Sequence, residues 1–243
     1  MRIYFFIFVF CTLLCNWTTS YADSKLMPIT ADSWLVADGD GRIIQSQNSK
    51  QLHSIASISK LMTVMIVLDA HQDLNEKIGL FTRGQTIQLA LIRSDNHAAE
   101  LLCNNYPGGR TACILAMNEK ARFLNLPNTH YVEPTGLSVM NTSTAEELVT
   151  IVMVASTYPE IVECAKMANG SIKQKKRLWT FRNTNPLIDK HDFIVSKTGY
   201  IRASGGCIVM MLDAKLGRRI VILLGSRNTR TRAPEAIALA DNY

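Results

Sequence analysis

The sequence of 243 residues is long enough for one domain with a sizeable core, and 47% of its residues are hydrophobic. The formal net charge is +6, but the basic residues are dispersed, apart from those at 173–177, and few aromatic residues lie among them. This pattern excludes any clear nucleic-acid interface, so we expect no nucleic-acid partner, whereas an anionic cell-wall or membrane surface suits the charge.

Residues 1–22 have the features of a secretory signal peptide. Arg2 supplies the positively charged N-terminal region, and residues 3–14 are almost wholly apolar. Cleavage is expected after the small residue Ala22. An uncleaved membrane anchor is the alternative, but the apolar stretch is short for a membrane-spanning helix. No later segment is long enough to span a bilayer, so we expect residues 23–243 to form a mature periplasmic or secreted chain without stable membrane insertion.

The next segment predicts a β-hairpin. Residues 34–37 and 42–45 flank the turn Asp38-Gly39-Asp40-Gly41. This turn is similar to the start of a calcium-binding loop, but the later ligands of such a loop are absent, so we interpret it as a turn only.

A serine and a lysine then precede a long apolar run. A helix from Ser57 to about Ala70 would be buried nearly all round, and it would place Ser57 and Lys60 on one face at its N-terminus. The helix dipole and the apolar surroundings both disfavour the lysine ammonium, so Lys60 could act as a base toward the Ser57 hydroxyl. The pair alone is a weak signal, because this spacing arises about once by chance in a chain of this length. A capping serine followed by a surface lysine is the alternative interpretation.

The middle of the chain is expected to be helical and its end to form strands. Helices are predicted over 86–93, 97–104 and 113–123, and from a capping box at Ser143–Glu146 to about 157. Strands are predicted over 171–181, 193–197, 206–213 and 219–224, with a closing helix over 235–242. This order indicates an α+β fold, in which a sheet lobe from about 23–70 and 171–243 carries an inserted helical lobe from about 71–170.

Four cysteines remain once the signal peptide is removed. Cys103 and Cys113 bracket a Pro-Gly-Gly turn and form the favoured disulfide pair, whereas Cys164 and Cys207 are interpreted as buried thiols. The cysteines lack the close spacing of a metal site, and no H-E-x-x-H sequence occurs. We therefore expect no metal and no organic cofactor.

Three short motifs follow one another along the chain. They are Ser57-x-x-Lys60, Ser94-Asp95-Asn96 and, at the end of a predicted strand, Lys197-Thr198-Gly199. Penicillin-binding proteins and class A β-lactamases carry this motif set. The middle motif is degenerate, since Ser-x-Asn also occurs at 46–48 and 226–228, but both of those stand out of order.

The chain resembles the low-molecular-mass penicillin-binding proteins, which are serine D-Ala-D-Ala peptidases, and among them the D-alanyl-D-alanine endopeptidase type. The likeness covers most of residues 23–243 and rests on segments 56–63, 94–99, 133–138, 183–185 and 197–200. The resemblance implies the fold shared by serine β-lactamases and DD-peptidases. In that fold an antiparallel five-stranded sheet carries an inserted α-helical lobe, and the active site lies between them.

The resemblance also implies roles for the residues of the first two motifs. Ser57 would be the acylated nucleophile and Lys60 its general base. Ser94 would relay protons on the opposite wall, and Asn96 would bind the substrate amide.

The third motif would complete the site. Lys197 would set the electrostatics of the cleft, and Thr198 would bind the terminal carboxylate of the substrate. Beyond Gly199, the backbone N–H of Tyr200 would form an oxyanion hole together with that of Ser57. Arg232 matches the family's carboxylate-binding arginine by position only, and a solvated surface arginine is the alternative.

The implied activity is hydrolysis of D-Ala-containing peptide bonds in the peptide stems of peptidoglycan, either in cross-links or at D-Ala-D-Ala ends. It would proceed through an acyl-Ser57 intermediate, which β-lactams would trap. One alternative is a non-catalytic cell-wall-binding or sensor module, which the short connection at 69–85 favours. The other is a β-lactamase, but no Glu-x-x-Leu-Asn stands between the second and third motifs. The chain ends soon after its last strand, without the C-terminal β-domain and membrane-associating helix of larger carboxypeptidases, which fits the expected periplasmic location.

Overall fold

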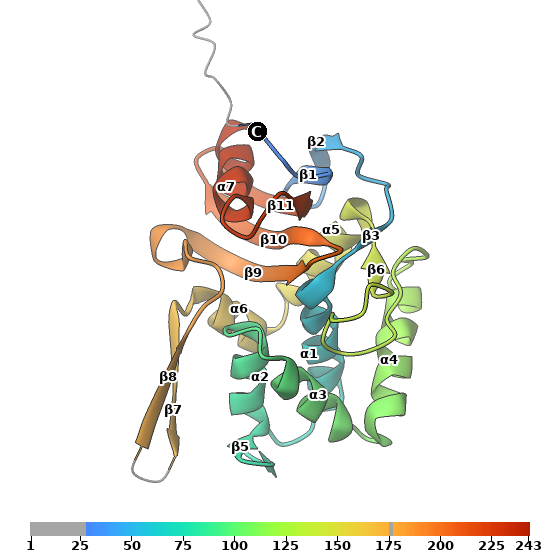
Figure 1. The fold of residues 1–243 in the computed structure, drawn as a ribbon, viewed down its shortest axis with the longest axis vertical. Coiled ribbons are helices and arrows are strands. Elements are labelled where there is room, and N and C mark those ends of the chain that lie inside the picture. Colours follow the sequence, from blue (N-terminus) through green and yellow to red (C-terminus); the bar gives the residue numbers. More distant parts are fainter. Residues whose placement is uncertain (1–27, 175–176) are drawn as a thin grey trace, which may run out of the picture.

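A five-stranded sheet forms the centre of the protein. The computed structural model describes residues 28–174 and 177–243, so the expected signal peptide lies outside the described residues. The strand order is β2-β1-β11-β10-β9, and every neighbouring pair is antiparallel (Figure 1). The predicted α+β class with a five-stranded antiparallel sheet is confirmed. The strands are β1 (Ser33–Asp38), β2 (Ile43–Gln47), β9 (Asp192–Ile201), β10 (Gly205–Ala214) and β11 (Gly217–Ser226).

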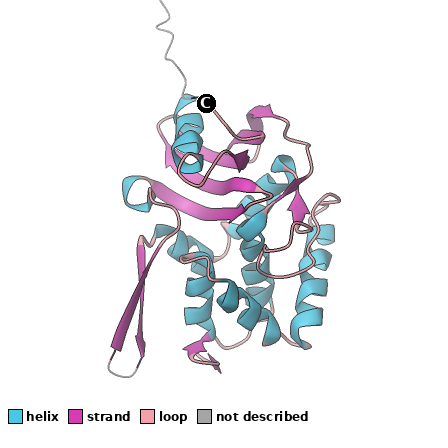
Figure 2. Ribbon diagram, viewed as in Figure 1, coloured by secondary structure: helices cyan, strands magenta, loops and turns pink. Residues whose placement is uncertain are grey.

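Most helices lie on one side of this sheet, between β2 and β9 in the sequence (Figure 2). Among the described residues, no single helix is long and apolar enough to cross a membrane; α5 and α6 reach that criterion only together, and the chain bends by 102° between them. The α-helices are α1 (Ser59–Asp69), α2 (Arg83–Leu91), α3 (Asn96–Asn104), α4 (Gly109–Phe123), α5 (Ala145–Ala155), α6 (Pro159–Lys166) and α7 (Arg232–Asn242). The short elements are η1 (Ala56–Ile58), η2 (Ile188–Lys190), β3 (His53–Ser54), β4 (Lys77–Ile78), β5 (Phe81–Thr82) and β6 (Thr142–Ser143).

The sheet separates two apolar cores because successive side chains of a strand point to opposite faces. Alternate residues of β10 divide between them: Cys207, Val209 and Met211 join the core on the α1 side, while Ile208, Met210 and Leu212 join the core on the α7 side. Both faces of the central strands are therefore covered, and the sheet is a rigid support for a site at its edge.

Helix α1 is the centre of the helical layer. Its residues from Ser59 to Val67 are buried, as the nearly all-round apolar sequence predicted. The helix was expected to begin at Ser57, but α1 begins at Ser59, and Ser57 lies in the 3-10 turn η1 that leads directly into it. The chain thus places a serine and a lysine at the buried N-terminal end of a helix, close to the sheet.

The expected single strand at 171–181 is wrong. The chain forms β7 (Asn169–Gln174) and β8 (Arg177–Arg182), which pair with each other outside the five-stranded sheet and project beside α2 (Figure 1). Trp179 stacks on Phe81 and holds the hairpin against the β4–β5 side of the molecule. No Gly, Pro or Asn separates the two strands in the sequence, so no turn residue indicates where one strand ends and the next begins.

The start of α5 differs by one residue from the predicted capping box. Thr144, not Ser143, is the N-cap, and its side chain accepts a hydrogen bond from Glu147 N at 3.2 Å. The Glu147 carboxylate is then directed to the neighbouring loop, where it accepts from Asn128 N at 2.9 Å. The chain turns after α5, close to the predicted end at about 157, and starts α6 with Pro159, a helix that the prediction did not name.

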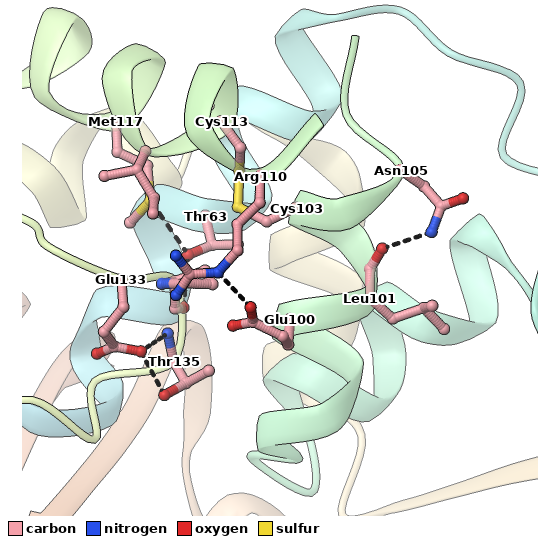
Figure 3. The surroundings of a disulfide bond; sticks show 12 residues. Thr63, Glu100, Leu101, Cys103, Asn105, Arg110, Cys113, Met117, Glu133 and Thr135 are labelled. Atoms are coloured by element: carbon pink, nitrogen blue, oxygen red, sulfur yellow. Dashed lines mark hydrogen bonds and ion pairs between the residues drawn. A yellow bond between two sulfur atoms is a disulfide. The ribbon is translucent and has the colours of Figure 1, made fainter. Parts of the chain in front are cut away.

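A disulfide joins α3 to α4, as predicted. Cys103 and Cys113 are bonded with their Cα atoms 5.3 Å apart, and Figure 3 shows the bond beside the Glu100–Arg110 ion pair. Closing a loop of this length lowers the conformational entropy of the unfolded chain, which stabilises the folded state by about 3 kcal/mol. Cys164 and Cys207 are free and buried, which also agrees with the sequence interpretation.

Candidate active site

The three motifs meet in one cleft between the sheet and the helical layer. Ser57 lies in η1, Ser94 and Asn96 lie where α2 passes into α3, and Thr198 lies on edge strand β9. The cleft has a volume of about 230 Å³. Its lining residues are Ser57, Ser94, Asn96, Leu137, Thr184, Thr198, Gly199, Tyr200 and Arg232.

Two glycines allow the nucleophile turn to sit against its neighbours. A Cβ at Gly136, whose φ is +82°, would lie 1.9 Å from the Ala56 carbonyl oxygen, and a Cβ at Gly199 would lie 3.0 Å from Ser57 N. Ala56 itself has a φ of 46°, an unusual value for a residue with a side chain. Strained backbone and close approach thus bring the Ser57 N–H next to β9, where the oxyanion hole is expected.

Lys60 is completely buried, and its amine contacts the nucleophile. Its Nζ donates to Ser57 Oγ at 2.9 Å, to Asn96 Oδ1 at 2.7 Å and to the Thr135 carbonyl oxygen. Burial lowers the Lys60 pKa to about 8, although the nearby Glu133 and Asp95 carboxylates oppose the shift. About a tenth of the molecules therefore hold a neutral amine at pH 7, beside the serine hydroxyl.

The second motif forms the opposite wall. Asp95 caps α3 by accepting from Ala98 N at 3.0 Å, which positions Asn96 in the first turn. Ser94 precedes the cap with a φ of 60°. Its hydroxyl accepts a hydrogen bond from Lys197 Nζ at 2.7 Å, so the second and third motifs are in direct contact.

The third motif supplies a buried lysine amine and a hydroxyl. Lys197 is 1% exposed and donates a second bond, to the Thr198 carbonyl oxygen, at 2.8 Å. Burial, with help from the nearby Lys60 and Arg232 charges, holds the Lys197 pKa well below its usual value. The Thr198 hydroxyl donates to Thr184 Oγ1 at 2.6 Å.

Arg232 belongs to the cleft and is not a surface arginine. Its side chain is 7% exposed, and Nη1 donates to the Gly199 carbonyl oxygen at 2.6 Å. Arg227 and Arg230 are exposed. Tyr200 is half-exposed and lies at the rim. All nine predicted site residues are therefore brought together, with Arg232 selected by the tertiary structure.

The sequence prediction left some parts of the site without a role. Thr135 provides the third partner of Lys60 through its backbone, and Thr184 lines the cleft after β8. Both lie in segments that carried the family resemblance. A backbone carbonyl leaves no residue-type signal, so only the structure reveals its contact with Lys60.

The geometry suits acyl transfer. A hydroxyl lies within hydrogen-bond distance of an amine with a lowered pKa, Arg232 lines the cleft, and the Lys197 amine lies behind its Ser94 wall. Among the described residues, no group of three or more His, Cys, Asp or Glu side chains is arranged to hold a metal ion.

Comparison with known proteins identifies relatives over most of the chain. The family described as D-alanyl-D-alanine carboxypeptidase (peptidase S11) matches residues 19–82 and 75–228. The chain is 38% identical over 218 residues to a D-alanyl-D-alanine endopeptidase of Escherichia coli K12, covering 79% of this chain and 70% of the relative. It is also 38% identical over 207 residues to a D-alanyl-D-alanine endopeptidase of Pseudomonas aeruginosa, covering 75% and 67%.

Solved structures share the fold at lower identity. The Streptomyces K15 DD-transpeptidase superposes with a TM-score of 0.82 at 21% identity, covering 88% of this chain and 96% of that one. Penicillin-binding protein D2 of Listeria monocytogenes, solved with ampicillin bound, gives a TM-score of 0.78 at 24% identity, covering 88% and 97%.

Proposed function

Because this chain belongs to the D-alanyl-D-alanine carboxypeptidase family of serine peptidases, we propose that Ser57 is the residue acylated during hydrolysis of D-Ala-containing peptide bonds in peptidoglycan. The observation that carries the assignment is the 2.9 Å contact between Lys60 Nζ and Ser57 Oγ inside the cleft. A buried amine with a pKa of about 8 is a base strong enough to take the hydroxyl proton and weak enough to be partly neutral.

Acylation follows from this contact. Neutral Lys60 accepts the proton of Ser57 Oγ as the oxygen attacks the D-Ala carbonyl carbon. The negative charge that develops on the carbonyl oxygen is held by the backbone N–H groups of Ser57 and Tyr200. The C–N bond then breaks, and the proton passes from Lys60 to the leaving amine, with Ser94 as the relay on the opposite wall.

Deacylation reverses these roles. A water molecule gives a proton to Lys60 and attacks the ester carbon, the second tetrahedral intermediate collapses, and Ser57 Oγ takes the proton back. The products are a D-Ala carboxylate and the free enzyme. A β-lactam would enter the first half of this cycle and remain attached to Ser57.

The remaining polar groups of the cleft are proposed to bind the substrate. Asn96 Oδ1 already accepts from Lys60, so its amide nitrogen is the group left to bond the substrate peptide. Thr198, Lys197 and Arg232 would bind the carboxylate at the end of the departing residue, since a cationic wall favours that charge.

We assign the endopeptidase reaction to this chain, meaning cleavage of D-Ala cross-links between two peptide stems. The support is the 38% identity to relatives named D-alanyl-D-alanine endopeptidase. The wider proposal is a single catalytic domain over 23–243, exported to the periplasm by residues 1–22, without membrane insertion and without a nucleic-acid partner.

The test is digestion of purified muropeptides. Cross-linked dimers and monomeric pentapeptides are incubated separately with the protein and with Ser57→Ala, and the products are separated by chromatography and weighed by mass spectrometry. We expect dimers to become monomers with wild type and to persist with the variant. Release of D-Ala from pentapeptides alone would assign the carboxypeptidase reaction, and no cleavage of either would support a binding module.

A further inference from the structure

The Glu133 carboxylate organises a loop that contacts the nucleophile and the base. Its Oε2 accepts from Thr135 N at 2.7 Å and from Thr135 Oγ1 at 2.5 Å, and its Oε1 accepts from Gly136 N at 2.7 Å and Ser138 N at 3.3 Å. Figure 3 shows Glu133 facing Thr135. Both oxygens of one side chain therefore determine the path of the backbone from 133 to 138.

Three successive residues of this loop touch η1 and α1. The Pro134 carbonyl oxygen accepts from Thr63 Oγ1 at 2.7 Å, the Thr135 carbonyl oxygen accepts from Lys60 Nζ, and Gly136 lies against the Ala56 carbonyl. A shift of the loop would thus move the groups around Ser57 and Lys60 together.

The hydrogen-bond capacity of Lys60 makes the Thr135 carbonyl important. A neutral lysine amine has two N–H donors and one lone pair. Two acceptors that cannot donate, the Thr135 carbonyl and Asn96 Oδ1, surround Nζ together with the Ser57 hydroxyl. When both N–H groups point to these acceptors, the lone pair is left to face Ser57 Oγ. That orientation is the one in which the amine can accept the serine proton.

We propose that Glu133 is a positioning residue for the Ser57–Lys60 pair, acting by holding the Thr135 carbonyl where it orients the neutral amine. The inference rests on the proposed acyl-Ser57 chemistry and adds a residue to it. Glu133 contacts neither reacting atom in this arrangement; it acts through its loop.

The charge of Glu133 has a second, separable effect. The carboxylates that act on the Lys60 charge are Glu133 on the loop and Asp95 before α3, and the titratable amine of Lys197 on β9 lies on the other side. The two carboxylates raise the Lys60 pKa against the effect of burial. Removing the charge at 133 would lower that pKa, whereas shortening the side chain would keep the charge and disturb only the position.

The experiment measures acylation by benzylpenicillin from pH 5 to 10 for wild type, Glu133→Gln and Glu133→Asp. Glu147→Gln is the matched control, because the Glu147 carboxylate also orders a loop through its bonds to Asn128 and Thr129, and has no bond to the 133–138 loop; Glu147 is buried and Glu133 partly buried. Thermal unfolding of each variant reports the stability of the fold separately from the rate.

We expect both Glu133 variants to lower the plateau rate about ten- to a hundredfold, since small misplacements of reacting groups have effects of that size. In Glu133→Gln, the pH at which the acylation rate reaches half of its plateau would also be lower than in wild type. In Glu133→Asp, that pH would be unchanged. Glu147→Gln would lower Tm but leave plateau and pH profile unchanged.

A Glu133→Gln protein that behaves like Glu147→Gln, with a lower Tm and a wild-type rate profile, would overturn the positioning role and leave the proposed function intact. Absence of acylation in wild type would overturn the acyl-Ser57 chemistry itself, so the two failures are distinguishable.

Discussion

The two walls of the cleft differ in the charges that surround their buried lysines. On the helical wall, Lys60 lies near the carboxylates of Glu133 and Asp95 and touches Ser57. On the sheet wall, the described hydrogen-bond partners of Lys197 and Arg232 are neutral oxygens, those of Ser94, Thr198 and Gly199. The carboxylates raise the Lys60 pKa against the effect of burial, which still lowers it to about 8, whereas the Lys197 pKa lies well below its usual value. In the proposed mechanism, the same residue type serves proton transfer on one wall and recognition of the substrate charge on the other.

The largest effect is expected from removing the base on the helical wall. Lys60→Met keeps much of the side-chain volume but cannot accept the Ser57 proton, so the acylation rate should fall about a thousandfold. Stopped-flow or quenched acylation by benzylpenicillin measures the rate, and circular dichroism checks that the variant is folded. A folded variant within tenfold of wild type would show that another group is the base.

The backbone of the helical wall should be nearly as sensitive. Gly136→Ala introduces a Cβ against the Ala56 carbonyl at a φ of +82°, so the free energy of unfolding should fall by at least about 3 kcal/mol. Gly109→Ala is the matched control, because its φ of +75° is similar but nothing lies within 4 Å of the new Cβ. Gly109→Ala should lower the free energy of unfolding by only about 1 kcal/mol. Denaturant unfolding compares the two, and equal losses would show that the contact with Ala56 does not matter.

Removal of a cation from the sheet wall should impair substrate recognition more than chemistry. Arg232→Ala should lower kcat/KM for a peptide with a free C-terminal carboxylate about ten- to a hundredfold, the effect of losing a charged hydrogen bond. For the same peptide with a C-terminal amide, the variant should have nearly the wild-type kcat/KM. Arg227→Ala, an exposed arginine on the same segment, is the control. An equal loss for carboxylate and amide would assign Arg232 to structure alone.

The smallest effect is the response of the helical wall to pH. The active amine is the neutral one, so the rate should rise with pH, with its midpoint near the Lys60 pKa of about 8. Between pH 7 and pH 8 the neutral fraction grows about fivefold. Pre-steady-state acylation across this range checks the rise; a rate that is flat or falls from pH 7 to pH 9 would contradict a lysine base.

The sequence predicted the helical wall better than the sheet wall. A spacing of three residues is a local property, and it correctly predicted that Ser57 lies next to Lys60, although Ser57 lies in η1 and not on α1 itself. Arg232 could not be separated from Arg227 and Arg230 by any local pattern, because its burial depends on the packing of α7 on β10 and β11, which brings its side chain to the Gly199 carbonyl oxygen.

Two other differences have similar causes. The separate strands β7 and β8 were not predicted, because the sequence between Gln174 and Arg177 consists of two lysines and holds no residue typical of a turn, so one strand was expected in place of two. The bond from Lys60 to Thr135 was missed because its acceptor is a backbone carbonyl, and only the path of the 133–138 loop determines where that oxygen points.

The intact mass of the mature protein after incubation with benzylpenicillin tests the central claim most directly, with Ser57→Ala as the control. The account predicts a lasting increase by one whole penicillin molecule in the wild type and none in the variant. An adduct that persists in Ser57→Ala, or no adduct and no consumption of penicillin by the wild type, would contradict the assignment of Ser57 as the nucleophile.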